Sequence, residues 1–162
     1  MEKDKVSEEI LQLVTFKLGE EEFGVDILQV MEIVNLDQGI TRVPKAPNFV
    51  EGVINLRGEI VPIVDLRKRF SLTLPSIGYN SRVIISQIAE GKSKVGMIVD
   101  SVVGVTRVSA SAVEQAPSIT KGVKEYYISG LVKFEDRLIV MLNLERALSA
   151  DEVKELAEAK MG

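Results

Sequence analysis

The fold is decided by two stretches that resemble each other, FVEGVINLRGEIVPIVDLRKRF at residues 49–70 and YISGLVKFEDRLIVMLNLERAL at residues 127–148. They align without a gap, and Gly52 falls on Gly130. Each stretch has two apolar runs around a short polar turn, a pattern typical of a β-hairpin. The chain therefore contains an internal repeat of a strand-rich unit.

The segments before these hairpins repeat as well. FGVDILQVMEIV at residues 23–34 corresponds to VGMIVDSVVGVT at residues 95–106. Each half therefore carries about five strands in the same order, and chance similarity between strand–turn–strand units is the competing interpretation. Because closing a sheet hides its strand edges, we expect an all-β protein of two small barrels. Each half is near the lower size limit for stability, so the barrels should share an apolar interface.

The length and composition indicate how the domain is organised. The chain has 162 residues, a number that suits one globular domain, which we expect over residues 8–148. The repeat predicts one subdomain at about 11–70 and a second at about 80–148. Ser149 and Glu152 form a capping-box pattern that predicts a short C-terminal α-helix over residues 149–162. The charged segment at residues 1–7 is expected to be flexible and is no signal peptide.

The composition also argues against several classes of function. The chain has no Cys, His or Trp, so thiolate or histidine metal sites, serine triads and histidine phosphotransfer are excluded. The net charge is -4, neither half of the chain is basic, and aromatic residues make up only 5%, which argues against nucleic acid as a partner. No apolar run approaches the roughly 18–20 residues of a membrane helix, so we expect a cytoplasmic protein without direct membrane insertion. Nothing in the chain predicts an enzyme or a cofactor.

Arg57 lies in the turn between the two strands of the first hairpin, where Gly58 supplies the positive φ that a tight turn needs. Arginine is enriched at interface hot spots and binds carboxylates with two hydrogen bonds. An ordinary solvated arginine is the alternative interpretation. The nearby run ILQVMEIV at residues 27–34 carries a single charge, on Glu32, and fits either a partner groove or a core strand.

Three acidic residues, Asp26, Asp65 and Asp100, lie at or near the ends of predicted strands. A phosphate-accepting receiver domain gathers such residues at the ends of parallel strands. Solvated carboxylates are the interpretation that we favour, because the crossover helices of a parallel α/β sheet are missing.

The sequence resembles the CheW family, the coupling proteins of bacterial chemotaxis. The residues that carry the resemblance are 23–34, the GVINLRG segment at 52–58, IVPIVDL at 60–66 and VGMIVDSVVGV at 95–105. The resemblance implies two five-stranded SH3-like β-barrels packed about a shared core. It also implies an adaptor without activity of its own, which links the regulatory domain of the histidine kinase CheA to the cytoplasmic tips of methyl-accepting chemoreceptors in membrane-associated arrays.

The resemblance assigns roles to particular residues. Partner-binding roles fall on Arg57, Glu32, Val30, Val102 and Val105, and structural roles fall on Gly52 and Gly130. We expect the protein to be a monomer on its own. The alternative function, from a different class, is a stand-alone β-barrel regulatory sensor that binds a small ligand or is phosphorylated on an aspartate.

Overall fold

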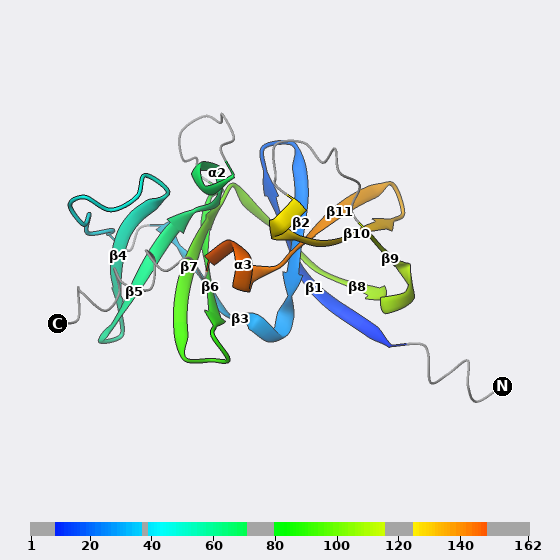
Figure 1. Cartoon of the computed structure of the whole chain (residues 1–162), viewed down its shortest axis with the longest axis horizontal. Coiled ribbons are helices and arrows are strands. Elements are labelled where there is room, and N and C mark those ends of the chain that lie inside the picture. Colours follow the sequence, from blue (N-terminus) through cyan, green and yellow to red (C-terminus); the bar gives the residue numbers. More distant parts are fainter. Residues whose placement is uncertain (1–8, 37–38, 71–79, 116–124, 149–162) are drawn as a thin grey trace.

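The computed structural model describes residues 9–36, 39–70, 80–115 and 125–148. Their strands form two sheets, each curled into a barrel, and the barrels lie side by side (Figure 1). The predicted all-β architecture of two barrels is thereby confirmed. The predicted C-terminal helix at 149–162 and the flexible segment at 1–7 lie outside the described residues.

One barrel has six strands in the order β8-β1-β2-β11-β10-β9. Its strands are β1 (Ile10–Leu18), β2 (Glu21–Asp26), β8 (Ser101–Ser109), β9 (Val113–Glu114), β10 (Ile128–Phe134) and β11 (Arg137–Leu142). Neighbouring strands are antiparallel except β2 and β11, which are parallel. The two-residue β9 accounts for the sixth strand of this barrel, where the repeat predicts about five.

The other barrel has five strands in the order β3-β6-β7-β5-β4, with β5 and β7 parallel. Its strands are β3 (Val30–Asn35), β4 (Val50–Leu56), β5 (Glu59–Asp65), β6 (Arg82–Ile88) and β7 (Ser93–Val99). A bridge between Thr41 and Val53 links the chain beyond β3 to β4, at the opposite end of the strand order, and so closes the barrel. The short helices are η1 (Ile27–Gln29), α2 (Leu66–Arg69), η3 (Ala110–Ala112), η4 (Glu125–Tyr127) and α3 (Leu144–Leu148).

Each barrel is built from both halves of the sequence. The six-stranded barrel combines β1 and β2 with β8–β11, and the five-stranded barrel combines β3–β5 with β6 and β7. The repeat is real, because β4–β5–α2 and β10–β11–α3 are the same hairpin followed by a short helix. The predicted subdomains at about 11–70 and about 80–148 nevertheless do not match the barrels. The halves exchange their first two strands, which apolar periodicity cannot reveal.

The barrels share one hydrophobic core. Its largest cluster draws on both sheets, and a chain of aromatic rings runs through it from Phe16 through Phe23 and Phe70 to Tyr127. Each barrel also has a smaller cluster of its own, around Ile63 in one and Ile139 in the other. Because the largest cluster is common to both barrels, neither barrel can separate without exposing apolar surface.

Arg69 joins the two helices α2 and α3 at the boundary between the barrels. Its guanidinium lies 4.3 Å from the ring centre of Phe49 and 5.2 Å from that of Tyr127, and its Nε donates a hydrogen bond to the Ala147 carbonyl at 3.0 Å. Phe49 and Tyr127 are equivalent positions in the repeat, as are Arg69 and Ala147. The contact therefore marks the approximate twofold axis between the barrels.

Candidate partner-binding site

Arg57 and Glu32 form a forked ion pair on the surface of the five-stranded barrel. The Arg57 guanidinium donates through Nη1 to Glu32 Oε1 at 3.3 Å and through Nη2 to Glu32 Oε2. The Arg57 side chain is 70% exposed and that of Glu32 31%. Hydrogen bonds from Arg57 lower the pKa of the Glu32 carboxyl below its ordinary value, so the pair stays charged at neutral pH.

The hairpin turn holds Arg57 in place. Arg57 and Gly58 both have positive φ, 52° and 90°, and Asn55 Oδ1 accepts a hydrogen bond from the Gly58 amide at 2.8 Å. A left-handed conformation is unusual for arginine and favours a tight two-residue turn between β4 and β5. The predicted position of Arg57 at a hairpin tip is confirmed. Its charge is presented on a short, well-defined loop.

Large hydrophobic side chains surround Glu32 along the chain. Leu28 is 81% exposed, Met31 43% and Ile33 42%. The pairing of β3 with β6 shifts between Val30 and Glu32, which makes Met31 the extra residue of a β-bulge. Along β3 the half-buried residues Val30, Glu32 and Val34 alternate with exposed Met31 and Ile33, so Glu32 has an exposed apolar neighbour on each side of it in the sequence.

The three predicted valines do not all lie on the surface. Val30 and Val102 are half-buried and pack against the shared core, whereas Val105 is 55% exposed on β8, at the edge of the other sheet. Arg57 and Glu32 are joined directly, by their ion pair. Val30 and Val102 are therefore better placed to support a partner surface from beneath than to form its outer layer.

Exposed Leu28, Met31 and Ile33 lie in the run at residues 27–34 that fitted either a partner groove or a core strand, although none of them was named as a site residue, and exposed Val103 was not considered. The repeat contains the signal that could have found two of them. Met31 is equivalent to Val103 and Ile33 to Val105, and both Met31 and Val103 lie at a shift in strand pairing. An apolar residue that occupies the same bulge in both halves points to two related surface stripes, one on β3 and one on β8.

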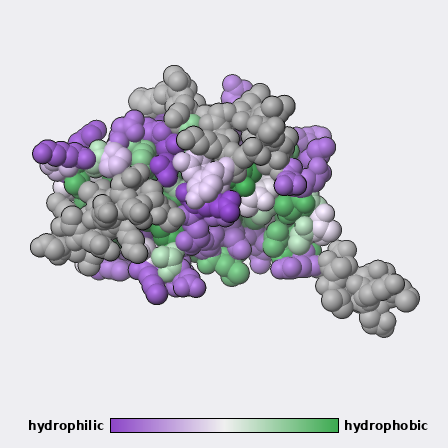
Figure 2. Space-filling model, viewed as in Figure 1, coloured by the Kyte–Doolittle hydropathy of each residue, from purple (hydrophilic) through white to green (hydrophobic). Residues whose placement is uncertain are grey.

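Among the coloured residues of the face drawn in Figure 2, hydrophilic ones predominate and hydrophobic ones emerge in small groups between them. Small groups of this kind are ordinary on a soluble domain, and only a contiguous patch of several hundred Å² would by itself indicate a partner. The candidate site therefore rests on the combination of the ion pair with the exposed residues of β3 and η1.

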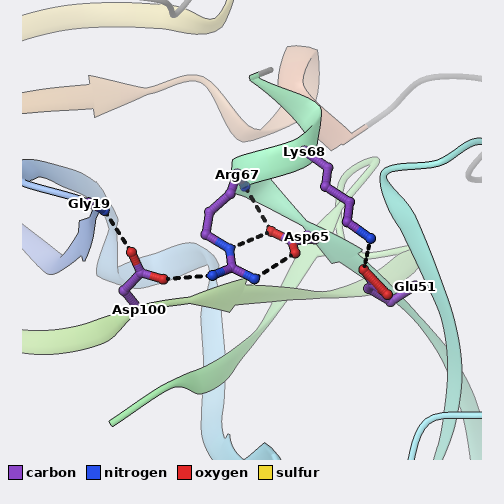
Figure 3. A network of polar contacts seen from close by, with 6 residues as sticks. All are labelled: Gly19, Glu51, Asp65, Arg67, Lys68 and Asp100. Atoms are coloured by element: carbon purple, nitrogen blue, oxygen red, sulfur yellow. Dashed lines mark hydrogen bonds and ion pairs between the residues drawn. The ribbon is translucent and has the colours of Figure 1, made fainter. Parts of the chain in front are cut away.

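Two of the candidate phosphate acceptors belong to one buried ion network. Asp65 accepts hydrogen bonds from Arg67 through both of its oxygens, from Nε and from Nη2, each at 3.0 Å (Figure 3). Arg67 Nη1 also donates to Asp100 at 3.2 Å, and Asp100 accepts from the Gly19 amide at 2.6 Å. The network links α2 of the five-stranded barrel to the β1–β2 turn of the six-stranded barrel.

The third candidate, Asp26, caps η1 by accepting a hydrogen bond from the Leu28 amide at 2.9 Å. All three aspartates therefore have structural partners, and the arrangement does not favour an aspartyl-phosphate site. Within the described ranges, no group of three or more acidic residues could hold a metal ion. Nor does any helix in the described part of the chain have the length and hydrophobicity needed to cross a membrane.

Comparison with known proteins gives consistent results. The CheW-like domain family matches residues 12–152. The chain is 40% identical to the chemotaxis protein CheW of Treponema pallidum, across 94% of this chain and 90% of that protein. It is 34% identical to the chemotaxis protein CheW of Bacillus subtilis, across 86% and 88%. The crystal structure of the scaffolding protein TtCheW from Thermoanaerobacter tengcongensis superposes with a TM-score of 0.82 at 35% identity, and covers 89% of this chain and 96% of that one.

Proposed function

The chain belongs to the CheW family, and we propose that it couples a CheA-type histidine kinase to the cytoplasmic tips of chemoreceptors. A chemotaxis scaffold without catalytic activity is the role that the related proteins support. The coupling of these two partners, and the association with membrane receptor arrays that follows from it, are our proposal for this chain.

The observation that carries the proposal is the Arg57–Glu32 fork with exposed Met31 and Ile33 on either side of Glu32. A helical receptor tip presents apolar anchors at i, i+3, i+4 and i+7, and such a helix can lie along the exposed apolar residues of β3. Arg57, which remains 70% exposed while it is paired, has donors left for a carboxylate or carbonyl of the receptor. The apolar residues would supply binding energy, and the ion pair would set the orientation.

The kinase would bind elsewhere. We place its regulatory domain on the six-stranded barrel, where Tyr126 is 60% and Leu138 51% exposed. Aromatic and large aliphatic side chains are the usual anchors at the centre of an interface. A receptor on one barrel and a kinase on the other would allow both partners to bind at once.

The test is receptor binding by the variant Arg57→Glu, measured by calorimetry with a receptor cytoplasmic fragment from the same organism. We expect at least a tenfold loss of affinity, because the substitution places two carboxylates together and removes the free donors. Folding should change little, because an exposed ion pair contributes about 0–1 kcal/mol. The matched control is Lys133→Glu, an exposed charge reversal on β10 of the other barrel, which should bind the receptor fragment normally. Unchanged binding by Arg57→Glu would overturn the assignment of the site.

A further inference from the structure

Met31 is the most accessible methionine in the described part of the chain. The protein has no Cys, His or Trp, so its five methionines are the groups most readily oxidised by peroxides. Met31 is 43% exposed, whereas Met97 is fully buried and Met141 is half-buried. Met1 and Met161 lie outside the described residues. Oxidation should therefore concentrate at Met31 among the methionines whose surroundings are known.

The position of Met31 gives its oxidation a consequence. It is the bulge residue of β3, next to Glu32 of the forked ion pair and close in sequence to exposed Leu28 and Ile33. Its equivalent in the other half is Val103, which has no sulfur. Only the stripe on β3 can therefore be altered by oxidation, while the related stripe on β8 stays apolar.

We propose that Met31 is a reversible oxidation site that controls binding to the β3 surface. In this step the thioether sulfur of Met31 attacks one oxygen of hydrogen peroxide. The O–O bond breaks, an S–O bond forms, the sulfur is oxidised by two electrons to the sulfoxide, and the peroxide is reduced to water. A methionine sulfoxide reductase with a thiol reductant reverses the change.

The sulfoxide weakens binding because it replaces a flexible apolar side chain with a polar one. A partner helix that covers Met31 in the reduced protein would have to bury the S–O dipole without a hydrogen-bond donor opposite it. We expect a loss of affinity of about tenfold, comparable to the removal of one apolar anchor from an interface. The inference rests on the proposed function, because it takes the receptor tip as the partner that covers β3.

The experiment compares the full chain with two variants, before and after treatment with hydrogen peroxide, by calorimetry against the receptor fragment. Mass analysis of the peptide that contains residue 31 reports the extent of oxidation. Met31→Leu should bind the receptor fragment with the same affinity before and after peroxide, since leucine is not oxidised. Met31→Gln, which is polar without oxidant, should bind about tenfold more weakly from the start. Reductase treatment should restore the affinity of the oxidised parent protein.

The possible failures can be told apart. If the oxidised parent keeps its affinity, the inference is wrong. It is also wrong if Met31→Leu loses as much affinity on oxidation as the parent does, because other methionines would then account for the loss. If Arg57→Glu weakens binding while Met31→Gln does not, the proposed function stands and the role of Met31 falls. If the unoxidised parent protein does not bind the receptor fragment, both fall.

Discussion

Gly52 lies within β4 and Gly58 in the turn between β4 and β5, yet the two positions need glycine for different reasons. Gly52 has φ 146°, and a Cβ there would lie 2.1 Å from the carbonyl oxygen of Thr41. Gly58 has φ 90° with open space around it. The first position therefore combines backbone strain with a clash against the bridge that closes the barrel, and the second involves strain alone.

We predict that Gly52→Ala destabilises the fold by about 3 kcal/mol or more, whereas Gly58→Ala costs about 1 kcal/mol. Urea unfolding followed by circular dichroism measures both. Gly130→Ala should also be destabilising, because a Cβ there would lie 2.5 Å from Val113 Cγ1, but by less than Gly52→Ala, because the clash is with a side chain and not with the backbone. Equal losses at Gly52 and Gly58 would mean that the neighbouring chain moves away freely, and that the bridge to Thr41 does not constrain the hairpin.

Sequence reasoning placed Arg57 correctly but could not identify its partner from physical arguments alone. Glu32 lies on β3 and Arg57 follows β4, and these strands stand at opposite ends of the order β3-β6-β7-β5-β4. They meet only because the sheet closes into a barrel. A contact that depends on closure leaves no trace in local periodicity, and only the family resemblance grouped the two residues.

The short connections between elements explain why the halves exchange strands. One residue, Asp100, separates β7 from β8, and the three residues of η1 separate β2 from β3. If the third strand of a half paired within that half, it would have to begin level with the beginning of the second strand. The chain leaves the second strand at its end, so it would first have to run back along the length of that strand, about 20 Å for six residues. Such short links cannot span that distance, so the chain continues into the other barrel. The strands themselves could be predicted from the alternation of apolar and polar residues. Which strands pair with one another could be predicted only from the lengths of the links between them.

The ion network at α2 ties those barrels together, and its two carboxylates should differ in importance. Asp65 is 1% exposed and accepts three hydrogen bonds from Arg67, from its amide, Nε and Nη2. The Asp100 side chain is 28% exposed and accepts one bond from Arg67. Without the negative charge of Asp65, the buried Arg67 guanidinium keeps only part of the negative charge that balances it.

We predict that Asp65→Asn costs about 3–5 kcal/mol of unfolding free energy, the range for breaking a buried ion pair. Asp100→Asn should cost only about 1 kcal/mol, since water reaches that side chain and the amide oxygen can still accept from Gly19. Both values come from chemical denaturation at neutral pH. If Asp100→Asn lost more unfolding free energy than Asp65→Asn, the contact of Asp100 with the β1–β2 turn would matter more to stability than the contact of Asp65 with Arg67.

At the scale of the whole molecule, two ion pairs occupy equivalent positions with their signs reversed. Arg137 on β11 pairs with Glu22 on β2, its Nε donating to Glu22 Oε1 at 3.1 Å, and Lys94 on β7 pairs with Glu59 on β5. In the repeat Glu59 is equivalent to Arg137, and Glu22 to Lys94. Each pair joins the two parallel strands of one barrel.

The reversed signs distinguish the observed assembly from the nearest alternative. Residues 36–49 connect β3 to the β4–β5 hairpin, a length that does not by itself prevent this hairpin from reaching β2 in place of β7. That arrangement would put Glu22 beside Glu59 and Lys94 beside Arg137. Glu22 is 6% exposed, so a second carboxylate next to it would be strongly unfavourable. We therefore predict that the four charges favour the observed hairpin in each barrel, a choice that the matching apolar patterns leave open.

The double variant Glu59→Lys with Lys94→Glu tests this role, because it keeps an attractive pair in the observed assembly while making the alternative attractive as well. The chain has no Cys, so introduced cysteines report strand pairing cleanly. Cysteines at Glu21 and Leu138, which lie just before the paired residues Glu22 and Ile139, should form a disulfide in the observed assembly. Cysteines at Glu21 and Ile60 should do so only in the alternative. We expect the parent charges to give the first disulfide alone after refolding, and the double variant to give both. If the double variant also gives only the first, the charges stabilise the barrels without selecting their hairpins.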